Sequence, residues 1–230
     1  MPDTGTKTPR ERYRTQVRAE IKERAWEQVA SAGASALSLN AIAKQMGMSG
    51  PALYRYFAGR DELITELIKD AYQSLADTLR AASAPPAVPA LAHALRRWAL
   101  DDPHRYFLVY GTPVPGYHAP DDVTVIASQI MATLLDACAA LPSPAPATPF
   151  DTHLESHRHW AADHPAPPPV LHLALTLWTR LHGILSLELA GHFNGMGFDP
   201  ALLFAAELDD LLPGTGLSHV VPPGDMVEER

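Results

Sequence analysis

Hydrophobic residues near the start of the chain recur at helical spacing. Over Thr15–Ala32 an apolar residue occupies every fourth position and charged residues lie between them, which predicts an amphipathic helix ending before Gly33. Leu39–Met46 and Ser49–Phe57 are predicted to form two short helices, because a serine suited to capping stands before the first and opens the second. A long fourth helix is predicted over Asp61–Ala81, with acids at its start and an apolar stripe along it.

Clusters of proline divide the rest of the chain into further helical segments, and neither a strand pattern nor an internal repeat is found. The predicted fold class is therefore all-α. Leu171–Leu189 is apolar on nearly all sides, so we expect it to be buried by its own core and by a second surface, which could be a partner chain. The helices predicted beyond Pro89 are Ala90–Leu100, Pro103–Tyr110, Asp121–Leu141, Thr152–Ala162 with Thr152 and Glu155 at capping-box spacing, Val170–His192 and Pro200–Leu212.

The composition is that of a globular protein. With 47% hydrophobic and 19% charged residues in 230, the chain is not disordered, collagen-like or a disulfide framework, and it can form one large domain or a small one joined to a larger one. We expect a basic arm at 1–13, a small domain at 14–60, a larger domain at 61–213 and a flexible tail at 214–230. Without a continuous apolar span or a leader-like start, no membrane contact is expected and the cytoplasm is the expected compartment.

Charge is distributed unevenly along the chain. Residues 1–60 contain ten Lys and Arg against five acids, a net charge of +5, whereas residues 61–230 carry eight bases and 21 acids, a net charge of −13. A basic module that binds a polyanion, joined to an acidic module with another task, explains this asymmetry. The alternative is that one surface is merely richer in Lys and Arg.

Two short helices separated by Gly47-Met48-Ser49 and preceded by a supporting helix predict a helix-turn-helix, whose second helix enters the major groove of DNA. Within Ser49–Phe57, Arg55 can bind guanine O6 and N7 with two hydrogen bonds, and the Ala52 methyl can contact a thymine methyl. The alternative for these side chains is an ordinary solvated face. The residues predicted to contact double-stranded DNA are Lys44, Ser49, Gly50, Pro51, Ala52, Tyr54, Arg55, Tyr56 and Arg60, with Lys44, Tyr54, Tyr56 and Arg60 directed at phosphates.

The segment from Leu39 to Leu63 resembles the DNA-binding signature of the tetracycline-repressor-like (TetR) family of bacterial transcription regulators. The resemblance extends from the first helix into the fourth and includes Ile42-Ala43, Gly47, Leu53-Tyr54, Phe57 and Asp61-Glu62-Leu63. Leu39 stands where the family often has a Thr or Ser that binds phosphate, and Arg60 replaces the usual Lys. The resemblance implies a homodimeric regulator, expected to be a repressor, that a small-molecule effector releases from a palindromic operator.

Trp178-Thr179-Arg180-Leu181-His182-Gly183 resembles the ligand domain of the subgroup of this family named for Trp, His and Gly. The resemblance implies a four-helix bundle between subunits, formed by the Leu171–Leu189 and Pro200–Leu212 helices. His182 is either a core histidine or a polar group facing an effector, and the other candidates can simply fill a core. The predicted effector-binding residues are Trp98, Tyr106, Phe107, Tyr110, Met131, Leu135, Trp178 and His182.

Two further hypotheses remain open. Arg10, Arg12 and Arg14 either reach a minor groove or belong to a disordered basic tail. His153, His157 and His159, with His164 nearby, allow a metal-responsive or enzymatic protein as the alternative function. Surface histidines are the more common reading of such a segment, and no complete catalytic motif is found. We therefore expect no enzyme activity, no metal and no cofactor.

Overall fold

The computed structural model describes residues 8–83, 87–118, 120–142, 148–161 and 163–212, and the regular secondary structure of these residues is entirely helical. The all-α prediction is thus confirmed. The helices are α1 (Pro9–Ala32), α2 (Leu39–Gln45), α3 (Gly50–Leu53), α4 (Arg60–Ala82), α5 (Val88–Asp101), α6 (Pro103–Tyr110), α7 (Asp121–Ala139), α8 (Pro149–Ser156), α9 (Pro168–Leu189) and α10 (Pro200–Leu211), with short 3-10 turns at Ala34–Ala36 and His159–Ala161.

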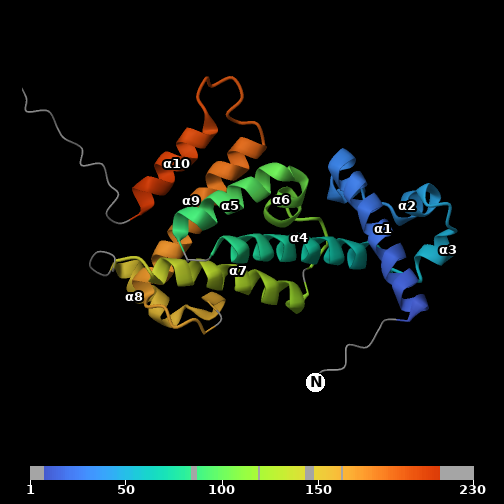
Figure 1. Cartoon of the computed structure of the whole chain (residues 1–230), viewed down its shortest axis with the longest axis horizontal. Helices are drawn as coiled ribbons and strands as arrows, with labels where there is room; N and C mark the ends of the chain where they lie inside the picture. Colours follow the sequence, from blue (N-terminus) through green and yellow to red (C-terminus); the bar gives the residue numbers. More distant parts are fainter. Residues whose placement is uncertain (1–7, 84–86, 119, 143–147, 162, 213–230) are drawn as a thin grey trace, which may run out of the picture.

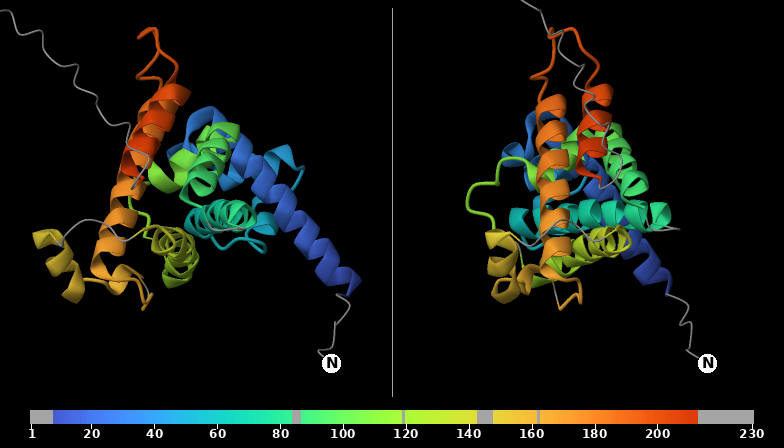
Figure 2. Two further views of the ribbon diagram at one scale, coloured as in Figure 1. Left: turned by 60° about the vertical axis from the view of Figure 1, so that its left-hand side comes forward. Right: turned by 90° about the vertical axis from the view of Figure 1, so that its left-hand side faces the viewer.

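The helices form a small head and a larger body that share α4. Helices α1, α2 and α3 lie together at one end of the molecule, and α4 runs from them into the middle of the body (Figure 1). There α4 packs mainly on α7 and α5, while α9 packs on α7, α8 and α10. Figure 2 shows α9 and α10 side by side, away from the head.

Helix α4 contributes to two separate hydrophobic cores. Its first half, including Leu63, Leu67 and Ile68, is buried with the apolar stripe of α1 and with α2 and α3. Its second half, including Leu75 and Leu79, is buried in the body core with α5, α7 and α9. The head core therefore extends past residue 60, where the sequence predicted the end of the small domain, because α4 is needed to cover the head.

Helix α1 begins at Pro9, six residues before the predicted start. The Thr8 hydroxyl accepts from the Glu11 N–H at 3.3 Å, and the Glu11 carboxylate accepts from the Thr8 N–H at 2.8 Å, a capping box that fixes the first turn. The part of the predicted arm from Pro9 to Tyr13 is thus helical, a correction to the expected basic arm. The rest of that arm at 1–7, and the predicted tail at 214–230, lie outside the described residues.

The bounds of most other helices lie within three residues of the prediction, and α8 and α3 differ more. The capping box of α8 is formed by Thr148 and Asp151, not by Thr152 and Glu155, since Pro149 starts the helix earlier. α8 then ends at Ser156, and the 3-10 turn follows. Helix α3 is a single turn that ends at Leu53, whereas the sequence predicted a helix up to Phe57.

Helices α7 and α9 have the length and apolar composition of a membrane span, with a mean hydropathy of 1.3 in each. Length and composition alone therefore do not exclude a membrane, contrary to the sequence argument. Both helices also contribute to the body core, as the core helices of a soluble protein do. The absence of a membrane partner remains a prediction.

Candidate DNA-binding surface and effector pocket

The corner between α2 and α3 turns on Gly47. This glycine has a φ of +65°, in the left-handed region that L side chains rarely adopt. The Met48 N–H donates to the Ala43 carbonyl at 2.8 Å, which closes the turn. Leu53 and Phe57 are fully buried in the head core, so α1 and α4 hold the corner in place. The predicted helix-turn-helix is present.

The predicted DNA contacts of this corner are accessible to solvent. Tyr54 is 49% exposed although it is aromatic, and Arg55 beside it is also exposed. Ser49 stands at the N-cap position of α3 but makes no capping hydrogen bond, so its predicted capping role is wrong. We define the reader surface as Lys44, Ser49, Pro51, Tyr54 and Arg55, which are exposed, together with Gly50, Ala52 and Tyr56, which are half-buried.

Arg60 has a different environment from the one the sequence suggested. Its guanidinium donates to the backbone carbonyls of Ala34 at 3.0 Å and Ser35 at 3.2 Å. These bonds join the start of α4 to the turn that follows α1. Arg60 is therefore occupied in holding the head together, and its predicted phosphate contact would have to compete with these bonds.

Arg18 on α1 is a positioning residue that the sequence reading missed. Its guanidinium lies 4.1 Å from the centre of the Phe57 ring and donates to the Tyr56 carbonyl. The same group forms ion pairs with Glu66 at 3.4 Å and Glu62 at 3.7 Å on α4. Arg18 thus ties the end of the reader surface to both supporting helices.

We call these contacts of Arg18 with Tyr56, Phe57, Glu62 and Glu66 the clamp, and the charge pattern of the sequence contains a signal for it. Arg18 and Lys22 are four residues apart on α1, and Glu62, Glu66 and Asp70 repeat every four residues on α4. Such spacings place like charges on one face of each helix, and the structure pairs Lys22 with Asp70 at 2.6 Å. Two complementary charged faces could have predicted that α1 packs on α4.

The body contains a pocket of about 430 Å³, which is within the size range of small-molecule sites. It lies among α4, α6, α7, α9 and the second 3-10 turn. Three of its residues, Tyr110, Met131 and Trp178, were predicted from the sequence to bind an effector. Its lining consists of Tyr72, Tyr110, Thr124, Ala127, Ser128, Met131, His159, Trp160, Leu175 and Trp178.

The other predicted effector residues lie outside this lining. Trp98 and Leu135 are buried in the body core, where the Trp98 indole N–H donates to the Ser74 hydroxyl at 3.1 Å. Phe107 lines a second pocket, of about 270 Å³, between α6 and the end of α1. Tyr106 is fully buried beside His182. The polar pocket residues Thr124 and Ser128 were missed, although they are four residues apart on α7 and therefore on one face of it.

His182 is surrounded by aromatic rings next to the pocket. Its ring centre lies 4.1 Å from that of Trp178, 4.3 Å from that of Tyr110 and 5.6 Å from that of Tyr106. Burial lowers the pKa of His182 to about 4, because desolvation disfavours the charged form. The imidazole is therefore neutral near pH 7.

Two buried polar atoms beside the pocket lack a hydrogen-bond partner among the described residues: Nε2 of His182 and the hydroxyl of Tyr110. Burial also raises the pKa of Tyr110 well above its usual value, so this phenol stays protonated. Buried polar groups are nearly always paired in folded proteins. Two such atoms at one place indicate a site for a polar group of a ligand.

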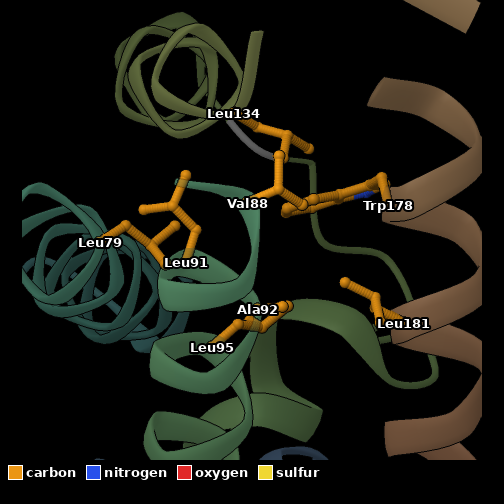
Figure 3. A pocket seen from close by; sticks show the side chains of 8 residues that line it. All are labelled: Leu79, Val88, Leu91, Ala92, Leu95, Leu134, Trp178 and Leu181. Carbon is orange, nitrogen blue, oxygen red and sulfur yellow. The ribbon is translucent and has the colours of Figure 1, made fainter. Parts of the chain in front are cut away.

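Trp178 separates the pocket from an apolar crevice. The crevice holds only about 20 Å³ and is lined by aliphatic side chains of α4, α5, α7 and α9 as well as by Trp178. Figure 3 shows Trp178 reaching from α9 toward Val88 and Leu134. The same indole lines the larger pocket, so one side chain forms the wall between the two spaces.

Comparison with known proteins agrees with this division into head and body. Residues 21–67 match the model of bacterial regulatory proteins of the tetR family, and residues 88–211 match that of the tetracyclin repressor-like C-terminal domain. This chain belongs to the TetR family. It is 38% identical over 211 residues to the HTH-type transcriptional regulators Mb1846 of Mycobacterium bovis and Rv1816 of Mycobacterium tuberculosis, an alignment that covers 84% of this chain and 90% of each relative.

Among solved structures, that of the protein SCO4313 is 71% identical to this TetR-family chain. The superposition has a TM-score of 0.84 and covers 89% of this chain and 99% of that one. The helix-turn-helix in the head and the helical body are thus those of a TetR-family transcriptional regulator.

Leu39 is one of the two positions, with Arg60, where this chain departs from the usual TetR signature. It is only 6% exposed and packs in the head core. Leu39 is therefore not placed to contact a phosphate, and the exposed Lys44 and Tyr54 remain predicted phosphate contacts.

One face of α9 and α10 exposes large apolar side chains. Leu202 on α10 is 70% exposed and Leu187 on α9 is 46% exposed, with Met196 and Phe198 exposed in the connection between them. Phe204 and Leu208 of α10 are buried in the body core with residues of α9, and the exposed ion pair between Arg180 and Glu207, at 3.0 Å, also connects the two helices. Exposed apolar side chains on neighbouring elements are typical of interaction surfaces, and we call Leu187, Met196, Phe198 and Leu202 the α9–α10 face.

The histidines of the alternative metal hypothesis do not gather around one point in the described part of the chain. The rings of His153 and His157 stack at 3.9 Å, and Nδ1 of His157 lies 2.9 Å from the His153 carbonyl oxygen. His164 lies 3.1 Å from Asp136 across the fold. Over the described part of the chain, no three His, Cys, Asp or Glu side chains are placed to hold one ion.

Proposed function

We propose that this TetR-family regulator is a homodimeric repressor that binds a palindromic operator through the reader surface and is released by a small-molecule effector bound in the 430 Å³ pocket. The observation that carries the proposal is that α4 belongs to both hydrophobic cores. One helix is buried in the head core at Leu63–Ile68 and in the body core at Leu75–Leu79, so a change in the body can move the head.

The reader surface has the chemistry that DNA binding needs. Arg55 is the exposed side chain there that can read guanine with two bonds, while Lys44 and the tyrosine hydroxyls suit phosphates. Gly50 and Ala52 are small enough for close approach to the bases. A second reader surface must lie about 34–36 Å away to reach the next half-site on the same side of the duplex.

The α9–α10 face supplies the dimer that this spacing requires. Its exposed leucines would be buried in a four-helix bundle with the same helices of a second copy. These helices correspond to Leu171–Leu189 and Pro200–Leu212, which the family resemblance of the sequence implies form a four-helix bundle between subunits. Cytoplasmic location, which is general for this family, is part of the same proposal.

An effector in the pocket would act on α4 from two sides. Tyr72 on α4 lines the pocket and packs against both hydrophobic cores. Thr124 and Ser128 line it from α7, whose first turn is joined to α4 by the ion pair of Asp122 with Lys69. A ligand that separates α4 from α7 would tilt α4, and a coupling of about 1–3 kcal/mol would change operator affinity about 5- to 150-fold.

The test is a gel shift of the full chain with the DNA that flanks its own gene, titrated with salt. We expect a specific complex whose log affinity falls with log salt by about 0.9 for each phosphate neutralised. Random DNA of equal length is the control. Equal binding of the two DNAs at every salt concentration would contradict the proposal.

A further inference from the structure

The lining of the 430 Å³ pocket restricts the charge of its ligand. Of its ten described lining residues, none is Asp, Glu, Lys or Arg, and His159 is exposed at the rim. His182, beside the pocket, is neutral. An ion without a counter-charge would lose its hydration there and gain little in exchange. The pocket therefore favours an uncharged molecule.

The hydrogen bonds of Tyr106 fix the chemistry of the unpartnered His182 nitrogen. The Tyr106 hydroxyl lies 3.2 Å from the His182 carbonyl oxygen, 3.0 Å from His182 Nδ1 and 2.9 Å from the Ser186 hydroxyl. The carbonyl can only accept, so Tyr106 satisfies all three contacts when it donates to that carbonyl and accepts from Nδ1–H and from Ser186. In this tautomer Nε2 of His182 has no proton, and it needs a donor from the ligand.

The Tyr110 hydroxyl, also unpartnered, can donate a proton to the ligand. A single oxygen atom that both donates to Nε2 of His182 and accepts from Tyr110 is that of a hydroxyl group. A ketone or an ester only accepts, and it would leave the imidazole nitrogen unpaired. These two atoms therefore favour a hydroxyl group over other uncharged polar groups.

The crevice behind Trp178 indicates the shape of the rest of the ligand. The Tyr110 and Trp178 rings lie 5.7 Å apart, so a molecule held at Tyr110 extends along the indole. Trp178 is partly exposed, and beyond it lie Leu91, Ala92 and Leu134. Rotation of the indole would join the crevice to the pocket and provide a continuous aliphatic surface for an apolar chain.

We propose that the effector is an uncharged, elongated alcohol whose hydroxyl binds Tyr110 and His182 and whose apolar chain passes Trp178 into the leucine-lined crevice. This inference rests on the proposed function and specifies the effector class of the same pocket. It concerns ligand chemistry alone, so it can be tested without DNA.

The probes are decanol, decanoate and methyl octyl ketone, which have equal carbon number and differ in the polar group. Calorimetric titration of the full chain is expected to show decanol binding about tenfold or more tightly than either of the others, because each of these leaves a buried polar group unpaired. Binding of decanoate or the ketone as tightly as decanol would overturn the proposal, as would the absence of decanol binding.

Two matched variants test the assigned contacts. Tyr110→Phe is expected to weaken decanol binding about tenfold without lowering the melting temperature of the ligand-free protein, since the lost hydroxyl is unpartnered. Ala92→Leu fills the crevice and is expected to weaken dodecanol more than hexanol. Decanol binding unchanged in Tyr110→Phe, or an equal effect of Ala92→Leu on both alcohols, would overturn the assignment.

Trp178 supplies an independent signal. In a Trp160→Phe background, which removes the other tryptophan of the pocket lining, decanol is expected to change the intrinsic tryptophan fluorescence, and this change is expected to disappear when Trp178→Phe is added. A change of equal size in that variant would contradict the movement of the indole. Failure of these titrations leaves the operator gel shift unaffected, and failure of the gel shift leaves the alcohol titrations standing, so the two proposals fail separately.

Discussion

The Tyr106 hydroxyl lies 3.0 Å from Nδ1 of His182, in the part of the body where α6 meets α9. Tyr106 is fully buried, and its hydroxyl also contacts Ser186. This contact orients the imidazole and leaves Nε2 as its ring nitrogen without a partner among the described residues. It joins the sequence motif Trp178-Thr179-Arg180-Leu181-His182-Gly183 to α6, which contributes Tyr110 to the pocket lining.

Tyr106→Phe keeps the ring and removes this network. We expect the free energy of unfolding to fall by about 1–3 kcal/mol, because Ser186 and Nδ1 of His182 are left buried without a partner. Denaturant unfolding measures the change, and Tyr110→Phe, which removes an unpartnered hydroxyl, is the matched control. Equal effects of the two variants would argue against the network.

His182 makes the free energy of unfolding depend on pH in the acidic range. The pKa of His182 is about 4 in the folded chain and about 6.5 when unfolded, so between these values the unfolded chain binds the additional proton. Stability therefore falls as the pH is lowered from about 6.5 to about 4, by at most about 1.4 kcal/mol per pH unit from this residue. His182→Gln should lose stability less steeply over that window in denaturant melts; parallel curves for variant and wild type would contradict the assignment.

Arg18→Met tests the clamp at the end of the reader surface. The variant keeps the apolar stem and loses the donor to the Tyr56 carbonyl and the pairs with Glu62 and Glu66, so we expect a loss of about 1–3 kcal/mol in head stability. We also expect weaker binding to DNA of any sequence. Lys22→Met, which removes an ion pair with Asp70 but no contact with the reader surface, should cost less than about 1 kcal/mol, and an Arg18 effect no larger than this would show that the clamp is unimportant.

The α9–α10 face can be tested with two exposed apolar residues. Leu202 is 70% exposed on this face, and Val125 is 59% exposed on α7, away from it. Leu202→Glu is expected to raise the dimer dissociation constant about tenfold or more by placing a charge in the interface, while Val125→Glu leaves it unchanged. Sedimentation measures both. A dimer that withstands Leu202→Glu, or dissociates equally with Val125→Glu, would place the interface elsewhere.

Local sequence signals were sufficient for most helices. Pro103 and Gly111 bracket α6, and its observed bounds match the prediction because both ends depend on neighbouring residues. The predicted length of α3 was wrong, since the chain after Leu53 continues as turns in which the Tyr56 and Phe57 N–H groups both donate to the Leu53 carbonyl, while Arg18 binds the Tyr56 carbonyl. Thr152 was mistaken for a cap because two threonines four residues apart offered similar boxes.

The candidate sites also differ in how well the sequence predicts them, according to whether their residues are contiguous in the chain. The reader surface follows from a contiguous motif, so it could be located from sequence. The pocket is assembled from five elements, and only Tyr110, Met131 and Trp178 of its lining were predicted. The role of Arg60 was missed for a related reason: its partners, the carbonyls of Ala34 and Ser35, are 25 or more residues away.

The most direct measurement of the central claim compares Arg55→Ala with Lys44→Ala on the operator and on random DNA. We predict that Arg55→Ala weakens operator binding by about 1–3 kcal/mol, relaxes the preference at one base position and changes random-DNA binding little, whereas Lys44→Ala weakens both DNAs alike and reduces the salt slope by about one. If Arg55→Ala binds the operator as tightly as the wild type, with the same base preference, α3 does not read DNA and the assignment is contradicted.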